Sequence, residues 1–145
     1  MIRHFLRMVL FGDSKDTKPE VYLRKLLFAH GLRYRKNVPQ IPGHPDIYLA
    51  RYRIAIFVHG CFWHRHQECK YAYIPKSRVN FWKNKFDANI KQDLIVREKL
   101  TMAGIRQVIV WECTIRTMQR DKTVEQTICS TFIEFLKGNL NYLEM

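Results

Sequence analysis

Apolar residues recur at near-helical spacing in three stretches of the chain. The first stretch begins after Thr17, a good N-cap residue, and ends before Gly31, a residue that commonly terminates helices. The other two cover residues 81–102 and 123–137, where apolar positions alternate with lysine, arginine and other polar residues. The pattern predicts three amphipathic helices.

Shorter apolar or alternating runs between these helices predict strands. Residues 32–38 alternate loosely, and the runs at 47–50, 54–58 and 108–111 are mainly apolar. The run at 54–58 is apolar throughout, which is typical of a central strand. A strand, helix, strand passage normally forms a right-handed crossover. We therefore expect an α/β fold with a mixed central sheet flanked by helices.

Length and composition indicate one folded domain. The 145 residues suffice for a single core, and 47% hydrophobic content argues against wholesale disorder. The polar, turn-forming residues 12–17 separate an N-terminal arm, residues 1–15, from the body of the domain. No apolar stretch approaches the roughly 20 residues of a membrane span. The cysteines occur without a convincing signal peptide. We expect a cytoplasmic monomer.

The charge changes this picture, because it indicates a partner. The formal net charge is +12, which favours an anionic partner, with nucleic acid ahead of an anionic membrane. The alternative is a basic protein whose charge serves only solubility.

Metal-ligating side chains gather in residues 57–69, FVHGCFWHRHQEC, directly after the central apolar run. Cys61, His66 and Cys69 supply three of the four ligands that a structural zinc ion usually needs. Cys113 follows the apolar run at 108–111 and completes the set if that strand lies beside 54–58. The alternative is that Cys61 and Cys113 are small buried apolar residues.

Further polar residues near this segment suit hydrolysis of a phosphodiester. Asp46 precedes one strand and His59 ends the next, while His64 lies between the metal-ligand candidates. A carboxylate with a backbone carbonyl is a good magnesium site, and a histidine can transfer protons at neutral pH. Equally, Asp46 could be a turn residue and His59 a core histidine. Glu20 stands three residues after Thr17, in the position of a capping box.

Two adjacent aromatic residues, Phe62 and Trp63, lie inside the same segment. On a basic protein, protruding aromatic side chains can wedge between base pairs, at a cost of about a few kcal/mol per unstacked step. The alternative is packing in a core.

Several motifs together resemble the very short patch repair (Vsr) family of DNA mismatch endonucleases. They are DTKPE at 16–20, PGHPD at 42–46, HGCFWH at 59–64 and VIVWEC at 108–113, with PKSR and FW between the last two. The resemblance covers about residues 16–113. It implies a restriction-endonuclease-like fold with a structural zinc ion. It also implies a magnesium-dependent nick beside the T of a T:G mismatch, formed where 5-methylcytosine has deaminated.

The resemblance also implies roles for individual residues. Asp46 and the main-chain carbonyl of Val58 would bind magnesium, and His64, oriented by Glu20, would activate water. His59 would stabilise the charged phosphorane. The remaining expected site residues are the zinc ligands Cys61, His66, Cys69 and Cys113, the intercalating Phe62 and Trp63, and the contacts to the mismatched region, Lys85 and Asn89. Lys85 and Asn89 could instead be solvated helix residues.

The chain departs from the family pattern at two places that concern function. Val58 stands where a threonine often precedes the first histidine. The arm lacks the usual polar, basic stretch, although Met8 could insert into DNA. These departures keep two alternatives open, namely a related restriction-type or structure-specific nuclease and a zinc-stabilised DNA-binding module without catalysis. The expected partner is double-stranded DNA with a T:G mismatch, and mismatch-repair proteins stay open as further partners.

Overall fold

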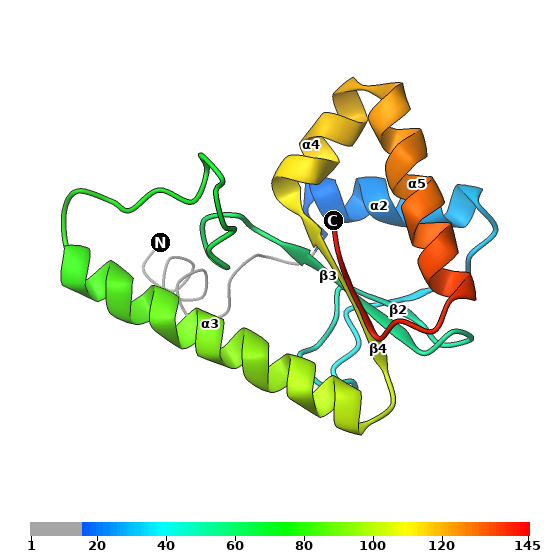
Figure 1. The fold of residues 1–145 in the computed structure, drawn as a ribbon, viewed down its shortest axis with the longest axis horizontal. Coiled ribbons are helices and arrows are strands. Elements are labelled where there is room, and N and C mark those ends of the chain that lie inside the picture. Colours follow the sequence, from blue (N-terminus) through cyan, green and yellow to red (C-terminus); the bar gives the residue numbers. More distant parts are fainter. Residues whose placement is uncertain (1–15) are drawn as a thin grey trace.

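The computed structural model describes residues 16–145 and shows a mixed sheet between helices (Figure 1). Within these residues the elements are, in chain order, α2 (Lys18–Ala29), β1 (Arg35–Lys36), β2 (Ile47–Leu49), β3 (Ile54–His59), α3 (Val79–Met102), β4 (Arg106–Trp111), α4 (Glu112–Arg120), α5 (Lys122–Lys137) and β5 (Tyr142–Glu144). The strands lie in the order β1-β2-β3-β4-β5. The β1–β2 and β2–β3 pairs are antiparallel, and β3–β4 and β4–β5 are parallel. The expected α/β class and mixed sheet are confirmed.

Helix α2 begins as the sequence predicts. The Thr17 hydroxyl accepts a hydrogen bond from the Glu20 backbone N–H at 3.4 Å, and Pro19 occupies the first turn. The Glu20 carboxylate in turn accepts from the backbone N–H of Asp16 at 3.1 Å, one residue before the cap. Glu20 is therefore part of a variant of the capping box.

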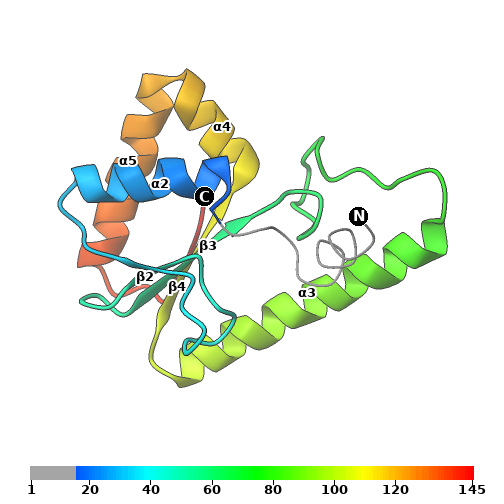
Figure 2. The same cartoon turned by 180° about the vertical axis from the view of Figure 1, so that it is seen from behind.

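The two faces of β3 are buried against different helices. Val58 belongs to an apolar cluster with Leu27 of α2 and Phe132 of α5. Phe57 points the opposite way and belongs to a second cluster with Leu100 of α3. Figures 1 and 2 show this division, with α2, α4 and α5 grouped on one side of the sheet and the long helix α3 crossing the other. Because both faces are covered, β3 is apolar almost throughout.

The crossover through α3 decides where the functional residues meet. Strands β3 and β4 pair in parallel from Ile54↔Arg106 to His59↔Trp111. Their carboxyl ends therefore lie at the same edge of the sheet, so the segment after β3 and the start of α4 are neighbours. The predicted zinc site depended on this arrangement, because Cys113 can join the other three ligands only if β4 lies beside β3.

Two elements were not predicted, and one strand is shorter than predicted. Helix α4 follows β4 without a loop, and β5 is a three-residue strand near the end of the chain. The bonds that hold β5 in the sheet run to β4, including Met145 N–H to the Ile109 carbonyl at 2.9 Å. The strand predicted over 32–38 is reduced to Arg35–Lys36, whose side chains are exposed.

None of the helices formed by residues 16–145 combines the length and the apolar character that crossing a membrane requires. The arm, with Met8, lies outside the described residues.

Candidate active site

The four expected zinc ligands come together at the carboxyl ends of β3 and β4. One ligand atom from each of Cys61, His66, Cys69 and Cys113 lies within 4.8 Å of the others. The Cys113 Sγ is 3.4 Å from the Nδ1 of His66. Three of these ligands follow β3, and Cys113 lies in the first turn of α4. The group can therefore hold a metal ion, and three sulfurs with one imidazole suit zinc.

The thiols of this cluster differ in their electrostatic surroundings. Burial raises the pKa of Cys61 to about 12, although a hydrogen bond from the Cys113 backbone acts to lower it. Burial also acts to raise the pKa of Cys69, but hydrogen bonds from the Tyr71 backbone and neighbouring thiols outweigh it, so that pKa is lowered. A divalent cation among these sulfurs would favour their thiolate forms.

A second group of polar residues lies on the α3 side of the same edge. The rings of His59 and His64 stack, with centroids 3.7 Å apart and planes 7° apart. The His64 Nδ1 lies 2.8 Å from a carboxylate oxygen of Asp93 in α3. The three residues line part of a cleft of about 290 Å³ between α3, β4 and β5. They are therefore within reach of a substrate.

The surroundings of His59 keep it neutral. Its exposed fraction is 8%. Burial, assisted by the neighbouring His64, holds the pKa of His59 well below its ordinary value. A neutral imidazole can donate or accept a hydrogen bond at physiological pH.

Ligand atoms of His59, His64 and Asp93 also approach within 4.8 Å of one another. However, an imidazole nitrogen binds a metal along the plane of its ring. Because the two rings are parallel and stacked, one ion cannot lie in both planes. The arrangement suits proton transfer better than metal binding.

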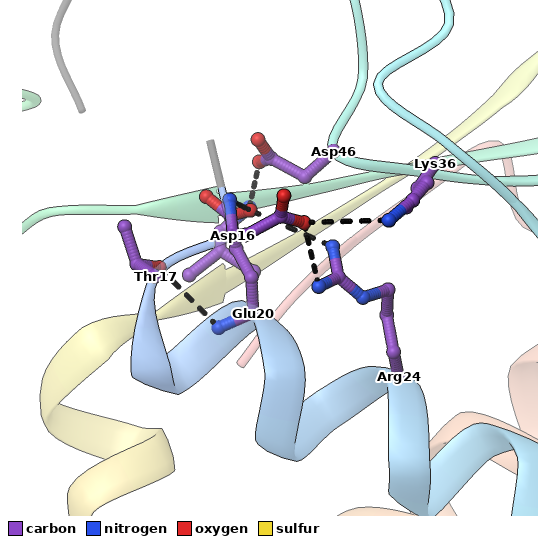
Figure 3. A network of polar contacts seen from close by, with 7 residues as sticks. Asp16, Thr17, Glu20, Arg24, Lys36 and Asp46 are labelled. Atoms are coloured by element: carbon purple, nitrogen blue, oxygen red, sulfur yellow. Dashed lines mark hydrogen bonds and ion pairs between the residues drawn. The ribbon is translucent and has the colours of Figure 1, made fainter. Parts of the chain in front are cut away.

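Asp46 reaches the end of β3 from the neighbouring strand. The antiparallel register pairs Ile47 with Ile56 and so places Asp46 opposite Phe57. The Asp46 Oδ2 accepts a hydrogen bond from the Val58 N–H at 2.7 Å (Figure 3). In a strand, the N–H and C=O of one residue point to the same side, so the Val58 carbonyl faces the same edge as Asp46. A carboxylate and a carbonyl thus stand together, as a magnesium site needs.

Charged residues at the start of α2 surround Glu20, which is only 3% exposed. Arg24 is also buried, and its Nη2 donates to Asp16 Oδ1 at 2.8 Å while its Nη1 lies 3.8 Å from Glu20 Oε2. Lys36 adds a second cation at 3.8 Å from Asp16. Figure 3 shows these groups beside Asp46. The network brings the carboxylates of Asp16 and Glu20 close to Asp46, the candidate magnesium ligand.

Aromatic side chains extend this site along the first half of α3, which projects beyond the sheet (Figure 1). The ring centroid of Phe62 lies 5.1 Å from those of both Trp63 and Phe86 and 5.4 Å from that of Trp82. Phe62 and Trp63 are half-buried. The two rings pack in an aromatic cluster at the surface. They are therefore neither fully buried in a core nor free of neighbouring side chains.

Comparison with known proteins shows the family of the chain. A family model described as DNA mismatch endonuclease Vsr matches residues 7–71. The DNA mismatch endonuclease Vsr of Escherichia coli is 36% identical over 125 residues, which is 86% of this chain and 78% of that protein. The chain belongs to the Vsr family. The type II nicking enzyme V.NmeAIP of Neisseria meningitidis serogroup A is 45% identical over 103 residues, 71% of this chain and 73% of the relative. V.XorIIP of Xanthomonas oryzae is 41% identical over 102 residues, covering 70% and 74%.

Vsr proteins are DNA endonucleases. One expected residue, Glu20, is not the partner of His64 in the structure. The carboxylate beside His64 in the structure is Asp93, whereas Glu20 lies in the α2 network with Asp16 and Arg24. Asp93 was missed because no motif marks it, although it follows Phe86 by two helical turns on α3. Asn89 donates to the Trp63 carbonyl at 3.0 Å, while Lys85 is half-buried on the same helix.

Proposed function

We propose that this Vsr-family protein nicks one strand of duplex DNA beside the T of a T:G mismatch, by magnesium-dependent hydrolysis of a phosphodiester. The observation that carries the proposal is the arrangement at the carboxyl end of β3. Asp46 accepts a hydrogen bond from the Val58 N–H there, and the next residue, His59, stacks on His64 beside the aromatic cluster. A hydrolytic group and a surface able to unstack bases are thus joined on one segment. A restriction-endonuclease-like fold is part of the same proposal.

Two metals fit the residues present. Cys61, His66, Cys69 and Cys113 fill the four positions of a zinc ion, which leaves none open for substrate and assigns zinc a structural role. Asp46 and the Val58 carbonyl would hold magnesium, which when bound supplies positive charge to the oxygens of the scissile phosphate.

The protein's own residues move the proton. Asp93 accepts the Nδ1 hydrogen of His64, which leaves Nε2 of that ring free to take a proton from water. The carboxylate also stabilises the imidazolium that forms. His59, neutral and stacked on His64, would donate a hydrogen bond to a phosphate oxygen. The net charge of +12 attracts DNA to the site.

The test uses two duplexes that differ only by T:G or C:G at one position, each incubated with the protein and magnesium. Nicking confined to the T:G duplex supports the proposal. Cleavage that ignores the mismatch indicates a restriction-type or structure-specific nuclease, and binding without strand scission indicates a DNA-binding module.

An Asp46→Asn variant sharpens this experiment. It should bind the T:G duplex with unchanged affinity but nick it at least about 100-fold more slowly, because the metal ligand is lost. Asp87→Asn is the matched control, since Asp87 is an exposed carboxylate on α3. Retained nicking in Asp46→Asn would remove the magnesium assignment.

A further inference from the structure

Arg65 lies between His64 and His66 in a left-handed backbone conformation, with φ of 55°. This conformation is uncommon for a residue with a side chain. It turns the guanidinium back over its own loop. Nη1 donates to the carbonyls of Phe62 and Tyr73, both at 3.1 Å, and Nη2 donates to the carbonyl of Ala72 at 2.6 Å. The same group lies 3.9 Å from the ring centroid of Phe86 in α3.

These contacts tie together three parts of the site. They join the loop that carries Phe62 and Trp63 to residues 72–73 and to α3. The planar guanidinium is suited to several fixed acceptors at once, which the ammonium group of lysine is not. Burial lowers the pKa of Arg65, so the charge is partly withdrawn from water to make these bonds.

The metal ligands alone do not fix the conformation of the loop between them. Its ligands Cys61 and His66 hold the two ends of the loop, but the carbonyl of Phe62 is held by Arg65 and that of Trp63 by Asn89. His64 is the next residue in the chain. The orientation of the aromatic pair relative to His64 therefore depends on side-chain donors as well as on metal.

We propose that Arg65 is a positioning residue that holds the aromatic pair, Phe62 and Trp63, in register with the proton-transfer residue His64. Insertion of the aromatic rings beside the mismatch then places the scissile phosphate at His64. The inference rests on the proposed function. It assigns Arg65 no contact with the reacting atoms.

The test compares Arg65→Met and Arg65→Lys with Arg33→Met. Arg33 is a matched control because its guanidinium lies over Phe28, 4.5 Å from the ring centroid, near the end of α2. All variants are mixed with a T:G duplex that carries 2-aminopurine next to the mismatched T. Fluorescence with calcium in place of magnesium reports unstacking, and single-turnover nicking at saturating protein with magnesium reports chemistry. Zinc content and thermal unfolding are measured in parallel.

We expect Arg65→Met to lose most of the fluorescence rise and about 100-fold in single-turnover rate, since small misplacements of reacting groups have effects of that order. Zinc content and binding to the C:G duplex should match those of Arg33→Met. Arg65→Lys keeps the charge but not the planar set of donors, and should stay closer to Arg65→Met than to the unaltered protein. If Arg65→Met does not fold, Arg65→Lys tests the role of Arg65 in its place.

Fluorescence and nicking within twofold of the unaltered protein in the Arg65 variants would overturn the inference. If the unaltered protein neither nicks the T:G duplex nor raises the fluorescence, the proposed function fails and the inference fails with it. If the unaltered protein does both and the Arg65 variants match it, only the role of Arg65 fails.

Discussion

The pairing of His64 with Asp93 makes a prediction at the scale of single residues. Asp93→Asn keeps the size of the side chain but removes the charge that fixes the histidine tautomer and stabilises its protonated form. Single-turnover nicking of a T:G duplex should fall about 100-fold or more, because without the Asp93 charge His64 loses its efficiency as a general base. Asp87→Asn, on the same helix, should nick at the normal rate. Equal rates in the two variants would contradict the assignment of Asp93.

The sequence could predict which candidate site residues come together where those residues are close in the chain or lie on adjacent strands. Cys61, His64 and His66 stand within a few residues of one another, and Asp46 is delivered by an adjacent strand. Asp93 is different, because its contact with His64 depends on the length and rotation of α3. No local pattern specifies that rotation, so only the structure could reveal the partner.

At the scale of elements, the metal cluster joins the loop after β3 to α4. Cys113→Ala should lose bound zinc and unfold at a much lower temperature, since structural zinc can contribute on the order of 10 kcal/mol to folding. Metal analysis and thermal unfolding measure both effects. Cys129→Ala is the control, because Cys129 lies in α5 outside the cluster. A normal unfolding temperature with full zinc content in Cys113→Ala would exclude this ligand.

Helices α2 and α5 are connected by Tyr22, whose hydroxyl donates to the carboxylate of Glu125. This bond, with a further one from Lys122, lowers the pKa of Glu125. The bond therefore stabilises the fold above the ordinary glutamate pKa, and its contribution is lost as the pH falls through the lowered value.

Tyr22→Phe should reduce the free energy of unfolding by about 1 kcal/mol at pH 7. The difference between the two proteins should shrink as the pH falls below about 4.5, where Glu125 begins to take up a proton in the unfolded chain. Urea unfolding at pH 7 and at successively lower pH measures this. A difference that grows on acidification would show that the bond does not act in this way.

The elements that were not predicted have a common physical reason. Helix α4 begins directly at the end of β4, with no turn residues to mark its start, and its buried side is formed by only two residues, Ile115 and Met118. Strand β5 contains Tyr142 and Glu144 and is held by backbone bonds to β4, which require no apolar alternation. Burial imposes a recognisable pattern on the sequences of α2, β3 and α5. Helix α3 was predicted from its recurring apolar residues, although several of them, such as Leu94, are exposed.

For the whole molecule, the net charge of +12 predicts a strong dependence of DNA affinity on salt. The slope of log K against log salt concentration should be about −0.9 for each phosphate neutralised. Lys85→Ala removes a candidate DNA contact and should make the slope less steep by about that amount. Binding titrations with C:G and T:G duplexes over a range of salt concentrations measure the slope. A slope near zero would show that phosphates are not the main source of affinity.

The parallel crossover from β3 to β4 also orders the events of folding. His66 and Cys113 are 47 residues apart in the chain, and we expect them to stay together only once α3 has formed and β4 has paired with β3. Closing such a long loop and pairing parallel strands are slow steps. A chain that ends before β4 holds Asp46, His59 and His64 without the cluster that fixes the loop between them. We therefore expect that a growing or truncated chain cannot cut DNA before the sheet is complete.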